Sequence, residues 1–373
     1  MVTGFFVVEV LCGLRQLGAA PSKSERHPTA VIIIPAHDEE AVIEATVRDV
    51  RLAAGDRVRI LVVADNCADR TAELARSAGA NLLIRNDPVH RGKGYALAAA
   101  RDDLRADPPE VVMVLDADCR IDRQSLDALV SSGAARPSQA VNLLAPDLKA
   151  APLVQVSSFA FLVKNLVRQR GLQRLAGRVH LTGTGMALPW DLFARANLGG
   201  SNIVEDLALG LDLAGQGTPP TLVERAMVWS PAASAGGTLV QRHRWEGGFL
   251  STMVAKSPAI LARSIRRGDV RGLCAALDLC VPPLALLATL NLLALTLGLF
   301  LVLAGAVAWP VLAAMTVGLF ASGAVVLAWL KEGRRFASAG TLARVPLYVL
   351  WKLPMYVGLV RRGAPKDWLR TGR

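Results

Sequence analysis

The chain has 373 residues, enough for one large domain or two smaller ones, and 52% of them are hydrophobic. Its 42 Lys and Arg against 31 Asp and Glu give a formal net charge of +11, which fits a phosphorylated substrate or an anionic membrane surface. There is no compact basic and aromatic patch of the kind that stacks bases, which argues against nucleic acid as a partner. The five cysteines lack metal-binding spacing and argue against a disulfide framework, which fits a reducing cytoplasm.

Residues 1–29 are predicted to form a short apolar segment followed by a polar linker. Residues 2–14 are largely apolar, but they fall short of the roughly 20 residues that normally cross a bilayer. A partial anchor, an interfacial helix and the remnant of a longer start all remain open. A cleaved signal peptide is disfavoured, because no positive first region and no small-residue cleavage site are evident.

Residues 30–255 read as one α/β domain in which buried strands alternate with helices. The strands are predicted at 31–35, 59–64, 81–84 and 111–115, and the helices between them at 39–53, 71–78 and 95–104. Strands that are apolar throughout indicate a parallel sheet covered on both faces. Ligands of such sheets bind at the carboxyl ends of the strands, where the polar clusters of this sequence fall.

The C-terminal part is predicted to hold the chain in a membrane. Residues 256–281 form a basic interfacial segment, and 282–330 form a transmembrane hairpin of two spans with Pro310 at the turn. Residues 331–373 comprise a basic loop, an interfacial or re-entrant helix over 341–360, and a tail. Because basic residues flank both outer ends of the hairpin, the positive-inside rule predicts a multi-pass protein of the cell membrane with its α/β domain in the cytoplasm.

Asp116 and Asp118 follow the apolar strand 111–115 with one residue between them. Two carboxylates so placed at a strand end can share a divalent cation, and their hard oxygen atoms suit Mg²⁺ or Mn²⁺. Such an ion neutralises charge on a departing nucleoside diphosphate. Surface acidic pairs are common, so the placement after a buried strand favours the metal interpretation.

Two further carboxylates follow the first two strands. Glu39 and Asp65 can each accept a hydrogen bond from a nucleobase or a ribose, although Asp65 also fits a simple turn. The neighbouring Asp38 and Asp69 are predicted to cap the helices that follow them.

Lys93 lies in a glycine-flanked basic turn, residues 90–94, just before a predicted helix. Glycines permit close approach of the backbone, and helix N-termini bind anions, so the turn could hold a phosphate or the sugar-nucleotide. A mobile surface turn is the alternative.

Asp206 lies within residues 203–213, an apolar run that suggests a partly buried helix start. A carboxylate held there can have a raised pKa and act as a general base. Alternatively, it only interacts favourably with the helix dipole.

The run 241–245 combines an amide, a planar cation and an indole in Gln241, Arg244 and Trp245. Arginine can bind a diphosphate through two hydrogen bonds, and tryptophan offers a flat face to a sugar ring. An amphipathic helix on the membrane surface is the alternative.

In this order the clusters resemble the motifs of family-2 glycosyltransferases with the GT-A fold. The matching segments are PAHDEE (35–40), ADNCAD (64–69), RGKGYAL (91–97), DAD (116–118), GTGMAL (183–188), VED (204–206) and QRHRW (241–245). The last of these is similar to the QxxRW motif of membrane-bound members, such as polysaccharide synthases and ceramide-glucosyltransferase-like enzymes. Ala64 and Val204 depart from the pattern, where an additional Asp and a Thr are frequent, and leave the subfamily open.

The resemblance implies a role for each cluster. Nucleotide-sugar contacts are implied for Glu39, Asp65, Lys93, Asp116, Gln241, Arg244 and Trp245. Metal binding is implied for Asp116 and Asp118. Asp206 would deprotonate the acceptor hydroxyl in an inverting, single-displacement transfer without a covalent sugar-enzyme intermediate.

We therefore expect a metal-dependent glycosyltransferase that moves a sugar from a nucleotide-sugar, first of all a UDP-sugar, to a lipid or saccharide acceptor. Such an activity at the cytoplasmic membrane face fits cell-surface glycan or glycolipid synthesis. A processive exopolysaccharide synthase is the second hypothesis, although the few predicted spans argue against a channel. A catalytically silent membrane scaffold is the alternative from another class.

Overall fold

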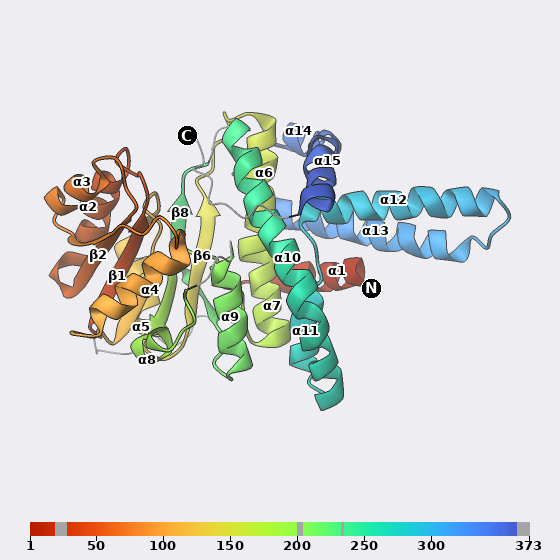
Figure 1. Cartoon of the computed structure of the whole chain (residues 1–373). Coiled ribbons are helices and arrows are strands. Elements are labelled where there is room, and N and C mark those ends of the chain that lie inside the picture. Colours follow the sequence, from red (N-terminus) through yellow and green to blue (C-terminus); the bar gives the residue numbers. More distant parts are fainter. Residues whose placement is uncertain (19–27, 200–203, 233–234, 364–373) are drawn as a thin grey trace.

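The computed structural model describes residues 1–18, 28–199, 204–232 and 235–363 of the chain. A single sheet lies between helices, a group of long helices covers one end of it, and a pair of helices projects from the body (Figure 1). The predicted α/β fold class with two C-terminal apolar helices is confirmed.

Strands β1 to β4 form the parallel half of the sheet that the sequence predicts. β1 (Ala30–Ala36) pairs with β2 (Val58–Asp65) on one side and β4 (Val111–Val114) on the other. β3 (Asn81–Arg85) continues the sheet beyond β2. Because all three pairings are parallel, the carboxyl ends of these strands lie at one edge.

The other four strands give the sheet a mixed second half. β7 (Met186–Pro189) runs antiparallel to β4 and also to β6 (Ser138–Leu144). β8 (Thr221–Ser230) runs parallel to β6, and the short β5 (Arg120–Ile121) pairs antiparallel with β8. The order across the sheet is β3-β2-β1-β4-β7-β6-β8-β5. The all-parallel arrangement thus holds only among β1 to β4, whereas the other four strands combine parallel and antiparallel pairings.

Alternate residues of the central strands supply two apolar cores, one on each face. Even-numbered residues of β1, such as Ile32, pack with α2 (Ile43–Ala54), α3 (Thr71–Ser77) and α5 (Arg123–Gly133). Odd-numbered residues, such as Ile33, pack with α4 (Lys93–Leu104), α8 (Trp190–Ala194) and α9 (Glu205–Gly215). The continuous apolar run of β1 is therefore needed because both of its faces are buried.

Two helix starts differ from the prediction. α2 begins at Ile43, not Glu39, and Asp38 does not cap it. Asp38 has a φ of 52°, and its carboxylate accepts a hydrogen bond from the Ala68 N–H at 2.7 Å, so it joins the loop after β1 to the loop after β2. α4 begins at Lys93, two residues earlier than predicted, which places this lysine in the first helical turn.

A layer of long helices covers the β6 and β8 end of the sheet. One continuous helix over 152–176 consists of α6 (Pro152–Leu162), the π-helical η2 (Val163–Arg168) and α7 (Gln169–Ala176). α10 (Ala235–Arg267) crosses it, and α11 (Val270–Leu279) follows (Figure 1). α10 runs through the predicted boundary at residue 255, so that boundary is not a break in the backbone.

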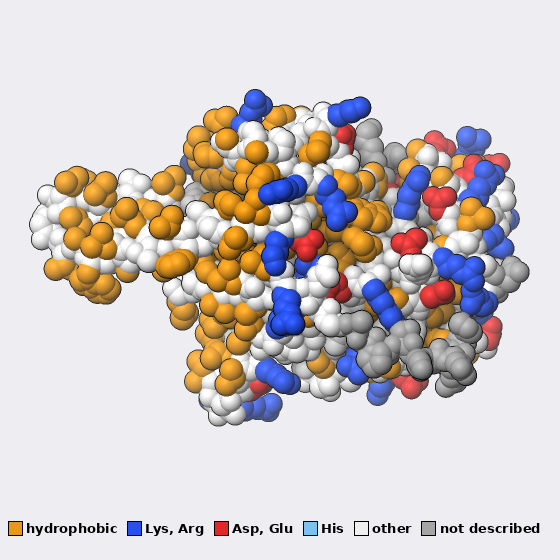
Figure 2. Space-filling view, turned by 180° about the vertical axis from the view of Figure 1, so that it is seen from behind, with side chains coloured by type: hydrophobic (Ala, Val, Ile, Leu, Met, Phe, Trp, Pro, Cys, Tyr) orange, Lys and Arg blue, Asp and Glu red, His pale blue; other side chains and the backbone are white. Residues whose placement is uncertain are grey.

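Two helices among the described residues are long and apolar enough to cross a membrane, α12 (Leu284–Leu303) and α13 (Trp309–Ala328). Only 6% and 11% of the residues in their most apolar stretches are buried, unlike the core helix of a soluble protein. Hydrophobic side chains cover the projecting arm, and Lys and Arg lie on the body beside it (Figure 2). Pro310 lies in the first turn of α13, where proline is well tolerated, and not in the connecting turn.

The C-terminal residues return to the body. α13 ends in the π-helical η3 (Trp329–Gly333), and the short α14 (Ala339–Leu342) leads into α15 (Val345–Arg362). The segment predicted over 341–360 is thus helical and packs on the body, with Tyr348 and Tyr356 buried against α6 and α12. The tail beyond residue 363 lies outside the described residues.

The N-terminal helix α1 (Val2–Gly13) is part of the packed body. Its backbone meets the 152–176 helix at two glycines: a Cβ on Gly13 would lie 1.9 Å from the Val167 carbonyl oxygen, and one on Gly171 would lie 2.1 Å from that of Glu9. The α1 residues Phe6 and Val10 share a core cluster with α13 and η2. α1 therefore joins the base of the projecting hairpin to the α/β body.

An ionic contact reinforces this junction. Arg168 binds Glu9 of α1 at 2.6 Å and Asp278 of α11 at 2.5 Å, and Asp278 also binds His180. Glu9 and Asp278 are fully or almost fully buried. Buried charges are costly unless paired, so this set fixes how three helices meet.

We predict that Gly171→Ala destabilises the protein by about 1–3 kcal/mol, the usual cost of overpacking, because the added methyl group collides with the backbone of α1. Gly4→Ala on α1 is the matched control, since a Cβ there meets nothing within 4 Å. Thermal unfolding of the detergent-solubilised protein measures both. Equal melting temperatures for Gly171→Ala and the wild type would contradict the close crossing.

Candidate functional site

The carboxylates of Asp116 and Asp118 lie just beyond the end of β4. Their oxygen atoms and the Cys119 thiol lie within 4.8 Å of one another, and the Asp116 side chain is 40% exposed. Cys119 is buried, and burial raises the pKa of its thiol well above the usual value, so the thiol stays protonated. The two oxygen donors are suited to Mg²⁺ or Mn²⁺, and the buried thiol adds little.

Residues 183–185 lie beside this carboxylate pair because β7 is antiparallel to β4. The pairing of Val114 with Met186 brings the residues before β7 next to those after β4. The Asp116 N–H donates to the Thr184 hydroxyl at 3.0 Å, and the Gly185 N–H donates to the Val114 carbonyl at 2.9 Å. Gly183 and Gly185 have φ values of 80° and 63°, which favour glycine at both positions.

Lys93 connects these two loops. Its ammonium group donates hydrogen bonds to an Asp116 carboxylate oxygen and, at 2.6 Å, to the Gly183 carbonyl. Burial alone would lower the pKa of this lysine, but Asp116 and Glu205 outweigh it and raise the pKa above the usual value. Lys93 therefore remains a fixed positive charge beside the carboxylate pair.

Asp206 reaches the same place from the first turn of α9. A Cβ on Gly183 would lie 3.1 Å from Asp206 Oδ2 and 3.4 Å from Lys93 Nζ, so glycine leaves room for both groups. Burial raises the pKa of Asp206, and burial together with the Asp206 charge raises that of Glu205 to about 8. A carboxylate with a raised pKa is a better proton acceptor near neutral pH.

Asp65 lies at the carboxyl end of β2 with its side chain almost fully buried. Its Oδ1 accepts hydrogen bonds from Arg85 at 2.6 Å and Asn66 at 3.0 Å, whereas Oδ2 has no partner among the described residues. A buried oxygen without a donor is costly, and an N–H group of a ligand would satisfy it. Glu39 lies in the adjacent loop, where its N–H donates to Thr71 at 2.8 Å.

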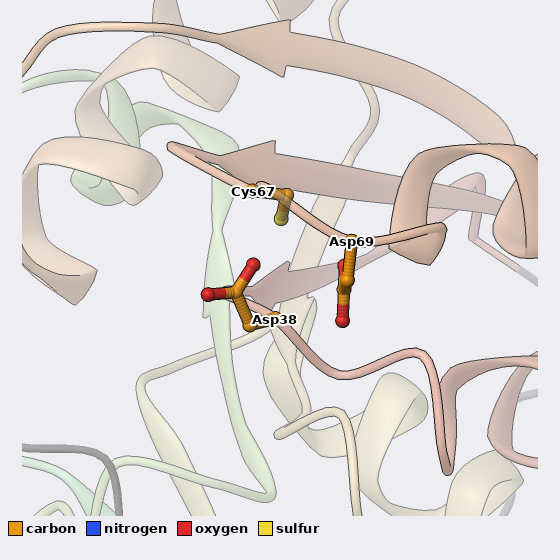
Figure 3. A group of neighbouring side chains, drawn as sticks. All are labelled: Asp38, Cys67 and Asp69. Atoms are coloured by element: carbon orange, nitrogen blue, oxygen red, sulfur yellow. The ribbon is translucent and has the colours of Figure 1, made fainter.

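A second group of possible metal ligands, Asp38, Cys67 and Asp69, lies on the loops after β1 and β2 (Figure 3). Its carboxylates accept backbone hydrogen bonds: Asp38 from Ala68, and Asp69 from the N–H groups of Glu40 at 3.1 Å and Thr71 at 2.9 Å. The group therefore fastens the two loops together and shapes the edge that holds Glu39 and Asp65. Asp69 helps to order the start of α3 through Thr71, close to the capping role predicted for it.

The 241–245 run lies on α10. Arg244 is half-buried, and this burial lowers its pKa. Asp116 and Glu205 interact with it electrostatically and act in the opposite direction, raising the pKa. The Trp245 ring is half-buried and packs 5.6 Å from Phe161 of α6, between centroids. Gln241 is half-buried one turn earlier on the same helix. The structure thus brings Lys93, Asp116, Asp206 and Arg244 together, while Trp245 also contributes to packing.

Sequence reasoning missed the residues that hold α10 in place. The buried Arg242 guanidinium lies 5.5 Å from the Trp245 ring centroid and 5.2 Å from that of Phe161, and it donates to Ser157. One turn later, buried Glu246 accepts hydrogen bonds from Lys352 and, at 2.8 Å, from Tyr356 of α15. The sequence does contain a signal for this contact: Lys352 lies within an apolar helix, and a charge in that setting requires a partner.

Residues 31–141 match the sequence model of the family described as glycosyl transferase family 2. The chain is 33% identical over 110 residues to the low-salt glycan biosynthesis hexosyltransferase Agl6 of Haloferax volcanii, covering 29% of this chain and 25% of that protein. It is 29% identical over 109 residues to the probable glycosyltransferase YdaM of Bacillus subtilis, covering 28% and 26%. The matches thus span about a quarter of the length of these curated relatives.

The fold also matches a solved structure, the mannosyltransferase PcManGT from Pyrobaculum calidifontis in complex with GDP-Man and Mn²⁺. The identity is 18%, the TM-score is 0.56, and the match covers 94% of this chain and 95% of the other. The expected GT-A fold is therefore confirmed, including its arrangement with the C-terminal helices.

We predict that Lys352→Met destabilises the protein by about 3–5 kcal/mol, because it leaves the Glu246 carboxylate buried without its cation. The double variant Glu246→Gln with Lys352→Met should recover part of this loss. Lys331→Met changes an exposed lysine and is the control. Thermal unfolding of the purified proteins measures the series, and a double variant no more stable than Lys352→Met would contradict a paired charge.

We predict that Glu205→Gln stabilises the metal-free protein at pH 8 by a few degrees of melting temperature, with little effect at pH 5. The pKa of Glu205 is raised to about 8 in the folded state, so from the ordinary carboxyl range up to pH 8 the folded state binds more protons than the unfolded state. The wild type therefore loses stability as pH rises through this window. Thermal unfolding with a chelator present tests this, with Asp212→Asn on the same helix as control. A benefit that is equal at both pH values would contradict the raised pKa.

Proposed function

We propose, because residues 31–141 match the glycosyl transferase family 2 model, that the chain is a membrane-bound, metal-dependent glycosyltransferase. It transfers a sugar from a nucleotide-sugar to a hydroxyl-bearing lipid or saccharide acceptor. The observation that carries the proposal is the meeting of Lys93, Asp116 and Asp206 at Gly183. An anion-binding lysine, a metal-binding carboxylate and a candidate general base therefore lie next to one another.

On the donor side, Asp116 and Asp118 would hold the divalent cation, which neutralises charge on the leaving diphosphate when bound. Lys93 adds a second positive charge at this place, fixed by its hydrogen bond to the Gly183 carbonyl. Arg244 brings a third from α10, near Asp116. Preorganised charges of this kind stabilise the developing leaving group without reorganisation.

The nucleoside would lie along the edge formed by the loops after β1 and β2. The unpartnered Asp65 Oδ2 can accept a hydrogen bond from a nucleobase N–H, and Glu39 lies in the adjacent loop. Uracil and guanine both carry such an N–H. PcManGT binds GDP-Man with Mn²⁺, and we first expected UDP, so both nucleotides belong in a donor screen.

On the acceptor side, Asp206 removes the proton from the hydroxyl as its oxygen attacks the anomeric carbon. The bond from that carbon to the diphosphate breaks in the same step, with inversion, and the diphosphate leaves toward Lys93. The raised pKa of Asp206 favours proton uptake. Glu205, with a pKa of about 8, lies beside it and can hold a proton at neutral pH.

The membrane assignment rests on the α12–α13 hairpin. Its described turn, residues 304–308, carries no charge, whereas Lys331, Arg334 and Arg335 lie at its base. The positive-inside rule then puts the base and the catalytic body on the cytoplasmic side. A hairpin of two helices encloses no channel, which favours transfer of one or a few sugars over export of a long polymer.

We predict that Asp206→Asn lowers transfer at least about 10²-fold while metal-dependent nucleotide binding stays near the wild-type value. The amide keeps the shape of the side chain but cannot take the proton. Release of UDP or GDP from candidate sugar donors, with Mn²⁺ or Mg²⁺ and mixed acceptors, measures transfer. Calorimetric titration measures binding.

Asp118→Ala is the matched comparison, because it should lose metal-dependent binding as well as transfer. Equal loss of nucleotide binding in Asp206→Asn and Asp118→Ala would argue against a base at Asp206. A wild-type protein that neither turns over any donor nor binds a nucleoside diphosphate with metal would contradict the proposal that the chain is an enzyme.

A further inference from the structure

Lys164 is an unusual residue in the long helix over 152–176. It is the one exposed residue between positions 152 and 173, and its immediate neighbours Val163 and Asn165 are buried. The first turn of the π-helical η2 contains it, and Asn165 fixes this turn to β6 by donating to the Asn142 carbonyl at 3.2 Å. Such π-helical turns frequently occur at functional sites.

The exposed Lys164 side chain faces the site already described. Its ammonium lies 5.6 Å from the ring centroid of Phe249, which follows Trp245 by one turn on α10. It interacts electrostatically with Asp206, which acts to raise the pKa of Lys164. In return, the positive charges of Lys93 and Lys164 act to lower the pKa of Asp206. The candidate base Asp206 therefore lies near two lysines, Lys93 on the donor side and Lys164 on another helix.

The two lysines differ in their partners. Lys93 is bound to Asp116, whereas no ion pair among the described residues includes Lys164. The other charges that act on Lys164 are Arg242, Arg168 and Glu246.

Most of these neighbouring charges are already compensated. Arg168 is neutralised by Glu9 and Asp278, and Glu246 by Lys352. The hydrogen bonds of Arg242 go to Ser157, a neutral residue. Lys164 and Arg242 are thus two neighbouring cations that no ion pair among the described residues includes.

Resting on the proposed function, we propose that Lys164 binds a phosphate group of the acceptor, beside the hydroxyl that Asp206 deprotonates. An exposed ammonium near a second cation that has no ion pair suits a phosphate ester, which it recognises by charge-assisted hydrogen bonds. The phosphate can belong to a lipid headgroup or to a soluble sugar or polyol phosphate. In either case the acceptor carries a hydroxyl and a phosphate a few bonds apart.

The first experiment measures inorganic phosphate binding to the full chain in detergent, saturated with Mn²⁺ and UDP or GDP so that the diphosphate site is filled. Lys164→Met should weaken phosphate binding about 10- to 100-fold, the usual effect of a hydrogen bond to a charged group. Lys164→Arg should keep most of the affinity. Lys256→Met, which removes an exposed lysine of α10 near Asp212, is the control and should change nothing.

The second experiment identifies the source of the phosphate by competition against inorganic phosphate. Nanodiscs containing phosphatidylglycerol are compared with nanodiscs containing diacylglycerol, and glycerol 3-phosphate is compared with glycerol. Competition by phosphatidylglycerol alone supports a lipid acceptor, and competition by glycerol 3-phosphate supports a soluble one. If neither phosphate ester competes, Lys164 binds only the free ion and the acceptor assignment is overturned.

The proposed function and this inference fail in different ways. A protein that binds no nucleoside diphosphate with metal contradicts the proposed function before phosphate is added. Normal nucleotide binding, combined with equal phosphate affinity in the wild type and Lys164→Met, overturns the role of Lys164 alone. Loss of nucleotide binding in Lys164→Met would also overturn it, because a residue of the acceptor side should leave the donor side intact.

Discussion

The ammonium group of Lys93 is the contact on which the site depends. It joins the loop after β4 to the loop before β7, through Asp116 and the Gly183 carbonyl, and Asp206 of α9 lies against the same glycine. These residues are 113 positions apart at their extremes, since 206 − 93 = 113. A positive charge amid the carboxylates of Asp116, Glu205 and Asp206 offsets repulsion that would otherwise separate them, so one lysine orders the loops. In the proposed reaction, the same charge would stabilise an anionic leaving group.

The parallel half of the fold could be predicted because each of its strands is a continuous apolar run that ends in a polar residue. That pattern placed Asp65 and Asp116 at one edge of the sheet, and the structure does so. The second half could not be predicted, because β7 has only four residues and its direction depends on pairing with β4 and β6. The proximity of Gly183 to Asp116 follows from that antiparallel pairing, which no local pattern contains.

Contacts between distant helices were also beyond a reading of the sequence. Lys352 lies within an apolar helix, and its partner Glu246 lies 106 residues earlier in the chain. Through this pair α15 holds the helix that carries Arg244 and Trp245, while α1 holds the 152–176 helix that carries Lys164. Both termini of the described chain therefore support elements of the candidate site, and the base of the apolar hairpin is packed into the same body as that site.

In the proposed membrane-bound enzyme, the length of the hairpin would set the height of the candidate site relative to the bilayer. α12 has 20 residues, which at 1.5 Å per residue span roughly 30 Å, the thickness of the hydrocarbon layer. With the hairpin inserted in a bilayer, the base of the body would rest at the depth of the lipid headgroups. An acceptor held at that depth could keep its acyl chains in the membrane, whereas a group deeper in the hydrocarbon layer would lie below the body. In the proposed enzyme, the hairpin would thus select acceptors by their depth in the bilayer as well as by their chemistry.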